Sequence, residues 1–192
     1  ETIIAGAAAS QKKVSEFAKD YNISGLEFMS CIPGSIGGGI RMNSGCFKKE
    51  FKDVLISIQF VDFKGIVRSI PANKINFKYR SIELPQDLIF LSATFKGKEK
   101  NSEEINDYMN ELNLIKNMAQ PTKIKTSGST FKNPINQTDK KVWELIRLSV
   151  PTGTHYGDAA ISEKHANFFV NKKNAKSADM KSLINFVKKK VK

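Results

Sequence analysis

Two short stretches of the sequence carry side chains that could hold or transfer charge. FKYRS places Arg80 beside Tyr79, and a guanidinium can bind a carboxylate or phosphate through two parallel hydrogen bonds. GSTFKNP gathers Ser129, Lys132 and Asn133 around a glycine turn that precedes a proline. Taken singly, each has a simpler interpretation: an arginine at the exposed end of a strand, and a turn whose hydroxyls cap the backbone.

A third stretch, CIPGSIGGGIRMNSG at residues 31–45, contains five glycines. Glycine lets backbone N–H groups approach a phosphate closely and tolerates the positive φ angles that shape an anion-binding concavity. The stretch is neither the phosphate-loop motif, which ends in Gly-Lys-Ser/Thr, nor the GxGxxG dinucleotide fingerprint. Its glycines therefore predict either an anion site or a tight surface loop, and glycine content alone does not choose between them.

The other reactive side chains show weaker patterns. His165 in SEKHANFFVN lies between a polar turn and an apolar run, where a histidine is more often a hydrogen-bonded structural residue than a catalyst. Cys31 and Cys46 are too few and too plainly spaced for a zinc site or a disulfide framework. We expect no metal site and assign no role to the two thiols.

The elements that must position these residues are short helices and strands in mixed order. We expect amphipathic helices at 10–21, 102–118, 140–148 and from 177 to the end of the chain. We expect strands at the start of the chain, in a hairpin over 54–70 that turns at DFKG, at 88–97 and at 158–171. This mixture predicts an α+β fold.

Two of the predicted helices have recognisable starts. Ser102 is the expected N-cap of the helix at 102–118, and Ser177 that of the last helix. The first of them should bury one stripe, formed by Ile105, Met109, Leu112 and Ile115. The polar residues just before this helix predict a joint between two structural units.

Length and composition are those of an ordinary folded protein. The 192 residues, 40% of them hydrophobic, can bury the core of one domain or of one domain and part of another. The formal net charge of +12 suits anionic ligands, but the lysines are scattered and no nucleic-acid-binding module is visible. No apolar run approaches the roughly twenty residues of a membrane span, and the start lacks a secretion signal. We expect a cytoplasmic protein with no nucleic-acid or membrane partner.

Taken together and in order, these stretches resemble one family, the UDP-N-acetylenolpyruvoylglucosamine reductases, which are flavoenzymes of bacterial peptidoglycan precursor synthesis. GLEFMSCIPGSIGGGIRMNSG looks like the family's flavin-contacting segment. FKYRS, GSTFKNP and SEKHANFFVN match its later signatures nearly letter for letter. Four motifs in the family's order make the resemblance specific, although each alone is weak.

The resemblance implies a fold and a division into domains. The family has a two-lobed FAD-binding domain of the PCMH type, followed by a smaller α+β substrate-binding domain. Residues 1–100 would form the second lobe, and residues 101–192 the substrate-binding domain. The first lobe, and a C-terminal segment with a third catalytic residue, would lie outside this chain, so we expect a fragment of a longer protein. The short path from FKYRS to GSTFKNP resembles the family's smaller subtype.

The resemblance also implies a reaction. NADPH would reduce FAD, and the flavin would then reduce the enolpyruvyl double bond of UDP-N-acetylglucosamine enolpyruvate to give UDP-N-acetylmuramate. Arg80 would stabilise an enolate-like intermediate and Ser129 would donate a proton, while Tyr79, Lys132 and Asn133 would contact substrate. We expect a bacterial cytoplasmic monomer whose partners are small molecules.

The glycine stretch would supply this chain's contacts to FAD, with Gly34 to Gly39 facing the pyrophosphate. The residues implied are Ile32, Pro33, Gly34, Ser35, Gly37, Gly38, Gly39, Met42 and Asn43. Two positions depart from the family pattern. Arg41 stands where an apolar residue is usual, and Asp158 stands where a glycine is common; aspartate tolerates positive φ better than most residues, so we expect the turn to survive.

Two other functions remain open on the sequence alone. One is a non-catalytic nucleotide-binding remnant that cannot hold FAD without the first lobe, and the other is a related FAD-dependent oxidase with another substrate. The truncated ends favour the first. The GSTFKNP and YRS motifs disfavour the second, because they are peculiar to the reductases.

Overall fold

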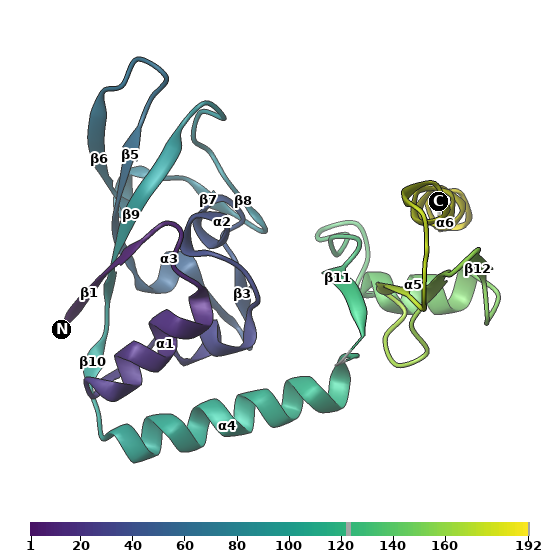
Figure 1. The fold of residues 1–192 in the computed structure, drawn as a ribbon, viewed down its shortest axis with the longest axis horizontal. Helices are drawn as coiled ribbons and strands as arrows, with labels where there is room; N and C mark the ends of the chain where they lie inside the picture. Colours follow the sequence, from purple (N-terminus) through teal and green to yellow (C-terminus); the bar gives the residue numbers. More distant parts are fainter. Residues whose placement is uncertain (122–123, 192) are drawn as a thin grey trace. The chain divides into compact units, whose positions relative to one another are not determined.

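The computed structural model describes residues 1–121 and 124–191, and the chain divides into two compact units, Glu1–Ile115 and Lys116–Lys192 (Figure 1). Each unit combines helices with sheets, which confirms the α+β class. Among the described residues, no helix is long and apolar enough to cross a membrane.

The first unit is built on an antiparallel sheet with the strand order β1-β9-β5-β6. Its strands are β1 (Thr2–Gly6), β5 (Leu55–Val61), β6 (Val67–Pro71) and β9 (Ile89–Lys96). Ala5, Ala93 and Ile58 lie opposite one another on three of them and are buried, because alternate side chains of a strand share one face. The strands predicted for this part of the chain are confirmed.

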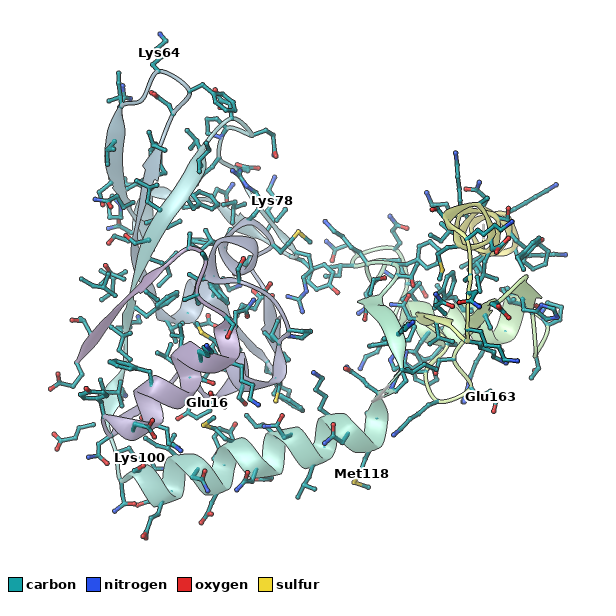
Figure 2. The ribbon with its side chains drawn as sticks, viewed as in Figure 1. Glu16, Lys64, Lys78, Lys100, Met118 and Glu163 are labelled. Atoms are coloured by element: carbon teal, nitrogen blue, oxygen red, sulfur yellow. The ribbon has the colours of Figure 1, made fainter. Side chains whose placement is uncertain are left out.

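The β5–β6 hairpin turns at DFKG, as predicted. Asp62 organises the turn, since its Oδ1 accepts hydrogen bonds from the N–H groups of Lys64 and Ile66 at 2.9 and 3.0 Å. Gly65 follows with a φ of +78°, which glycine adopts without a steric penalty. Lys64 extends from the tip of the hairpin (Figure 2).

Three helices cover one face of this sheet: α1 (Gln11–Asp20), α2 (Ile36–Arg41) and α3 (Phe51–Val54) (Figure 1). A 3-10 turn, η1 (Glu27–Cys31), lies between α1 and α2 in the sequence. The Ser10 hydroxyl caps α1 by accepting the Lys13 N–H at 3.2 Å. Val14, Ile36 and Phe51 bring the helices into the same buried core as the sheet.

The helix α4 (Ser102–Ala119) contains the division between the two units. Ile105, Met109 and Leu112 are buried as predicted, whereas Ile115 is 44% exposed, so the stripe is shorter than expected. The Asn113 amide donates to the Ser30 hydroxyl at 3.3 Å and ties this helix to the first unit. We expected a domain boundary after residue 100, before the helix; the compact units divide inside it.

The predicted cap of α4 is wrong by one residue. The Asn101 side-chain oxygen accepts the N–H of Glu103 at 2.7 Å, while the Ser102 N–H donates to the side-chain oxygen of Asn22 at 3.0 Å. Asparagine and serine cap helices equally well, so local sequence does not choose between neighbours of this kind.

Three pairs of two-residue strands complete the first unit, together with the 3-10 turn η2 (Ala72–Lys74). They are β2 (Ile23–Ser24) with β10 (Lys98–Glu99), β3 (Gly45–Cys46) with β4 (Lys49–Glu50), and β7 (Phe77–Lys78) with β8 (Ser81–Ile82). Strands this short have no measurable hydrophobic period, so the sequence does not predict them. Two of these pairs position the polar residues of the site.

The second unit has an antiparallel sheet with the strand order β11-β14-β13-β12 and two helices. The elements are β11 (Lys125–Ser129), α5 (Val142–Ser149), β12 (His155–Tyr156), β13 (Ala159–Ile161), β14 (Phe168–Asn171) and α6 (Ser177–Lys190). Ile146, Phe169 and Leu183 are fully buried in its core.

Two predictions for this unit need correction. The single strand expected at 158–171 is two antiparallel strands, because the polar segment SEKH forms a turn in which the Phe168 N–H donates to the His165 carbonyl at 2.9 Å. The predicted N-cap Ser177 is already helical, and the helix is preceded by Lys176, whose N–H donates to Asp179 Oδ2 at 2.9 Å.

Candidate active site

The middle of the glycine stretch, with Gly37, Gly38 and Gly39, is the short helix α2, whereas Gly34 lies in the bend before it with a φ of +139° and Gly45 begins β3. Ser35 is the N-cap of α2, and its hydroxyl accepts the N–H of Gly38 at 3.2 Å. A Cβ on Gly39 would lie 2.3 Å from Cζ of Phe51, and a Cβ on Gly37 would lie 3.2 Å from the side chain of Ala7. These two glycines therefore let the helix pack closely against its own unit, which is a structural need that the sequence did not reveal.

Gly38 has a different environment. It is exposed, and a Cβ there would meet nothing nearer than the Ser35 hydroxyl at 3.4 Å. Packing within this unit therefore does not require glycine at this position. The smooth backbone that it leaves on the outer side of α2 would suit a ligand that approaches closely.

The nine residues predicted to contact the cofactor differ in exposure. Those exposed are Pro33, Gly34, Gly38 and Met42; those half-buried are Ile32, Ser35 and Gly37; those buried are Gly39 and Asn43. Gly39 and Asn43 lie against other residues of the first unit.

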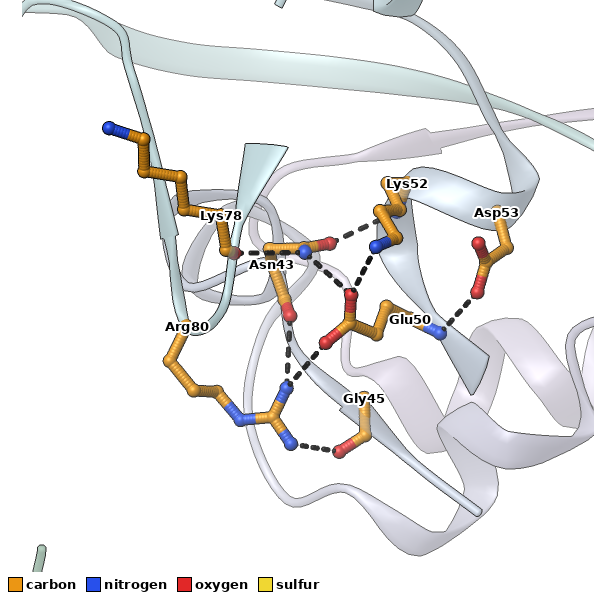
Figure 3. A network of polar contacts seen from close by, with 7 residues as sticks. All are labelled: Asn43, Gly45, Glu50, Lys52, Asp53, Lys78 and Arg80. Carbon is orange, nitrogen blue, oxygen red and sulfur yellow. Dashed lines mark hydrogen bonds and ion pairs between the residues drawn. The ribbon is translucent and has the colours of Figure 1, made fainter. Parts of the chain in front are cut away.

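Asn43 links three parts of the first unit. Its amide donates to Glu50 Oε2 at 3.0 Å and to the Lys78 carbonyl at 3.2 Å, and its side-chain oxygen accepts the Lys52 N–H at 3.1 Å (Figure 3). It is fully buried and has a φ of +39°, a region in which asparagine is more common than most residues. Asn43 therefore fixes the β3–β4 hairpin to the strand that leads to Arg80.

Arg80 occupies the two-residue turn between β7 and β8, with a φ of +52°. Its Nη2 donates to the Gly45 carbonyl at 2.6 Å, and its Nη1 donates to the Asn43 carbonyl at 3.2 Å and to Glu50 Oε1 at 3.4 Å (Figure 3). The guanidinium also lies 5.0 Å from the ring centre of Tyr79. The turn thus presents a half-buried cation whose two terminal nitrogens face the β3–β4 hairpin.

Glu50 is itself held in place. Its Oε2 lies 3.0 Å from the ammonium of Lys52, and its N–H donates to Asp53 Oδ2 at 2.8 Å. The hydrogen bond to Glu50, with the attraction between the two charges, raises the pKa of Lys52 above its usual value. Two cations therefore share one carboxylate.

Ser129 lies in the second unit, exposed at the end of β11 and opposite Phe168 of β14. The pairing is irregular between Thr126 and Ser129, and Gly128 has a φ of +86° at this irregularity. A bulge of this kind redirects the side chains that follow it.

Buried Asn167 holds the chain just after Ser129. Its amide nitrogen donates to the Phe131 carbonyl, and its side-chain oxygen accepts the Phe131 N–H, each at 2.9 Å. Its own carbonyl accepts the Thr130 N–H at 2.8 Å. Three hydrogen bonds from one buried residue therefore fix the backbone that follows the predicted proton donor.

The other motif residues of this unit have visible structural partners. Asn133 is half-buried, and its side-chain oxygen accepts the N–H of Val142 at the start of α5 at 3.1 Å. Lys132 is exposed. Nδ1 of His165 accepts the N–H of Asn167 at 3.2 Å, and its ring packs against Phe168 at 4.8 Å between centres. These contacts agree with the structural interpretation of the histidine.

Arg80 and Ser129 belong to different units, and each unit supplies its own part of the predicted catalytic pair. One unit holds a fixed cation, and the other exposes a hydroxyl on a bulged strand.

Residues 120–192 match the family model of the UDP-N-acetylenolpyruvoylglucosamine reductase C-terminal domain. The crystal structure of the UDP-N-acetylenolpyruvylglucosamine reductase from Thermus caldophilus matches with a TM-score of 0.87 and 31% identity, over 97% of this chain and 68% of that one. The chain belongs to the UDP-N-acetylenolpyruvoylglucosamine reductase family. The resemblance inferred from the four motifs is confirmed.

Curated members of the UDP-N-acetylenolpyruvoylglucosamine reductase family are closer in sequence. The protein of Pelagibacter ubique is 63% identical over 188 residues, and one from Rickettsia bellii is 44% identical over 189 residues. Each comparison covers 98% of this chain and 62% of the relative. The chain thus spans less than two thirds of the length of these curated family members.

The two departures from the family pattern have local explanations. The Arg41 guanidinium donates to the carbonyls of Pro85 and Leu88 at 3.0 and 3.1 Å and lies 4.6 Å from the ring centre of Phe90. Asp158 does not have the positive φ that we expected it to need; Gly157 alone takes it there, at +53°. The turn therefore accepts aspartate without strain.

Sequence reasoning missed Glu50 and Asn167. Glu50 meets Arg80 from 30 positions away, and Asn167 meets Phe131 from 36 positions away. No periodicity or short motif reports contacts at such separations. For Asn167, its place inside a quoted family signature was the one available signal.

Proposed function

We propose that the protein carrying this chain is an NADPH-dependent flavoenzyme that reduces UDP-N-acetylglucosamine enolpyruvate to UDP-N-acetylmuramate. The observation that supports this most directly is the Arg80 guanidinium, held at a left-handed turn by three contacts in a family whose members carry this activity in their name. The proposal concerns the whole protein that carries this chain; the chain itself spans 62% of the length of the curated relatives from Pelagibacter ubique and Rickettsia bellii.

The outer side of α2 fits FAD. Gly38 is exposed with no packing need for glycine, and Ser35 places a hydroxyl at the start of the same helix. When bound, FAD would accept hydride from NADPH and deliver it to the substrate. The exposed residues Pro33, Gly34, Gly38 and Met42 would lie against it, while Gly39 and Asn43 would act by shaping the segment.

Arg80 would stabilise the charge that develops in the substrate. Delivery of hydride to one carbon of the enolpyruvyl group places negative charge on the neighbouring carbon and its carboxylate. A guanidinium that is already fixed need not reorganise as this charge appears, so it lowers the barrier. Tyr79, beside Arg80, would line the same part of the substrate site.

Ser129 would donate the proton that completes the reduction. A hydroxyl is a weak acid, but a carbanionic carbon is basic enough to take its proton if a nearby cation stabilises the alkoxide. Lys132 and Asn133 would contact substrate from the same loop. The match of residues 120–192 to the family's C-terminal domain model supports substrate binding by the region that we assign to residues 101–192, with residues 1–100 forming the second flavin lobe.

The test is the colour of the complete protein that carries this chain. We expect it to be yellow and to oxidise NADPH rapidly only when the enolpyruvyl nucleotide is present, with slow oxidation by oxygen otherwise. We further expect a cytoplasmic monomer. A colourless preparation that FAD cannot reconstitute would overturn the proposal and favour a non-catalytic remnant.

A further inference from the structure

We propose that Glu50 is the positioning residue that fixes the Arg80 guanidinium. The consequence for catalysis rests on the role proposed above for Arg80, whereas the consequence for the motion of Arg80 does not. Glu50 and Arg80 lie on separate hairpins, β3–β4 and β7–β8, which meet at this contact (Figure 3).

The turn alone does not determine where the guanidinium lies. Arg80 is in the left-handed region, and its long side chain would otherwise sample many rotamers. The carbonyls of Asn43 and Gly45 accept hydrogen bonds from it, but both are neutral. Among the contacts described for Arg80, Glu50 provides the anionic group, at 3.4 Å, with 28% of the Arg80 side chain and 21% of the Glu50 side chain exposed. Charge at this degree of burial is screened less than at the open surface.

Glu50 can do this because its own position is fixed. The Asn43 amide and the Lys52 ammonium both lie 3.0 Å from its Oε2, which leaves Oε1 directed at Arg80. Asp53 holds the backbone of Glu50 through its N–H. A carboxylate already ordered by other partners loses little further conformational entropy when it holds a guanidinium.

The charges around the shared carboxylate are balanced. Arg80 and Lys52 carry two positive charges, and Glu50 and Asp53 carry two negative ones. Glu50 therefore orients Arg80 within a cluster in which each guanidinium or ammonium group has a carboxylate to offset its charge.

The first experiment measures the motion of Arg80 in this 192-residue chain by ¹⁵N NMR of its guanidinium groups. The chain has four arginines, Arg41, Arg68, Arg80 and Arg147, so the Nε signals can be assigned by substitution. Glu50→Gln should increase the exchange rate of the Arg80 guanidinium protons about tenfold, the factor expected on losing a charge-assisted hydrogen bond. Glu50→Asp keeps the charge and should have a smaller effect.

Glu83→Gln is the matched control. Glu83 makes an ion pair with Lys78 and accepts the Asn76 amide at 2.6 Å, so this variant also removes a carboxylate next to the Arg80 hairpin without touching Arg80. It should leave the Arg80 signal unchanged. If Glu50→Gln and Glu50→Asp both leave the exchange rate within twofold of the original chain, the positioning role is overturned.

The second experiment uses the complete flavoprotein and follows its two half-reactions. Glu50→Gln should slow reoxidation by the enolpyruvyl nucleotide about tenfold and leave reduction by NADPH unchanged, because only the first uses Arg80. If Glu50→Gln makes Arg80 mobile but reoxidation keeps its rate, the catalytic role proposed for Arg80 is overturned. The positioning of Arg80 by Glu50 would still stand.

Discussion

Arg80 adopts a backbone conformation that costs an arginine about 1 kcal/mol or more relative to an extended one. Glycine would avoid this cost at the turn, but it would provide no guanidinium. A strained residue persists when the surrounding structure holds it, and here the carbonyls of Asn43 and Gly45 and the carboxylate of Glu50 do so. The strain at this residue therefore agrees with a functional demand on its side chain.

For Ser129, we predict that Ser129→Ala slows reoxidation by substrate by about 100-fold or more, the usual effect of removing a general acid. Reduction of the flavin by NADPH should keep its rate, as measured by stopped-flow absorbance of the complete protein. Ser127→Ala, two positions earlier on the same exposed strand, is the control. Equal slowing of both half-reactions would exclude Ser129 as the proton donor.

His165 makes the stability of the second unit depend on pH. Burial lowers the pKa of its imidazole below the ordinary value of 6.5, with a further contribution from the positive charge of Arg147. The unfolded chain then binds a proton at a higher pH than the folded chain does, so the stabilisation is present above about pH 6.5 and is lost as the pH falls.

Urea unfolding of the chain between pH 5 and 7.5 tests this, with His165→Gln as the comparison. The original chain should lose more stability than the variant over this range. If the free energy of unfolding changes with pH equally in the two proteins, the lowered pKa of His165 is contradicted.

At the scale of elements, we predict that the neighbouring glycines Gly38 and Gly39 of α2 differ in how much stability the chain loses when each is replaced by alanine. Gly39→Ala should destabilise the chain by about 2 kcal/mol or more, because a Cβ 2.3 Å from the Phe51 ring forces that ring to move. Gly38→Ala should change stability by less than about 1 kcal/mol, since its Cβ would make only a van der Waals contact of 3.4 Å with the Ser35 hydroxyl. Urea unfolding of this chain measures both, and equal losses would show that packing does not distinguish the two positions.

The sequence predicted elements that carry their own local signals. The Asp62–Gly65 turn and the buried residues Ile105, Met109 and Leu112 are examples, because turn chemistry and helical spacing are visible within a few residues. The helical glycines were not predicted, since the reason for Gly39 is the ring of Phe51, twelve positions later in the sequence. The Glu50–Arg80 contact was missed for the same reason at a longer range.

At the scale of the whole molecule, the buried side chains of α4 indicate that a stable fragment of the first unit must include this helix. A fragment 1–119 should retain the stability of this unit, whereas 1–100 should lose about 4 kcal/mol or more with the buried side chains Ile105, Met109 and Leu112. Thermal and urea unfolding of the two fragments make the comparison. Equal midpoints would mean that α4 contributes nothing to the first unit.

A cysteine thiol, that of Cys31, lies where α4 packs against the rest of the first unit. Cys31 is 3% exposed, and its thiol lies 3.7 Å from the side-chain oxygen of Asn113 on α4, whereas Cys46 is only half-buried. A thiol reagent should therefore modify half-buried Cys46, whose thiol donates to the Phe28 carbonyl at 3.2 Å, faster than Cys31, which we expect to react when α4 separates from the rest of the unit. The labelling rate of Cys31 then measures how often α4 detaches from the first unit, and no residue has to be substituted for the measurement.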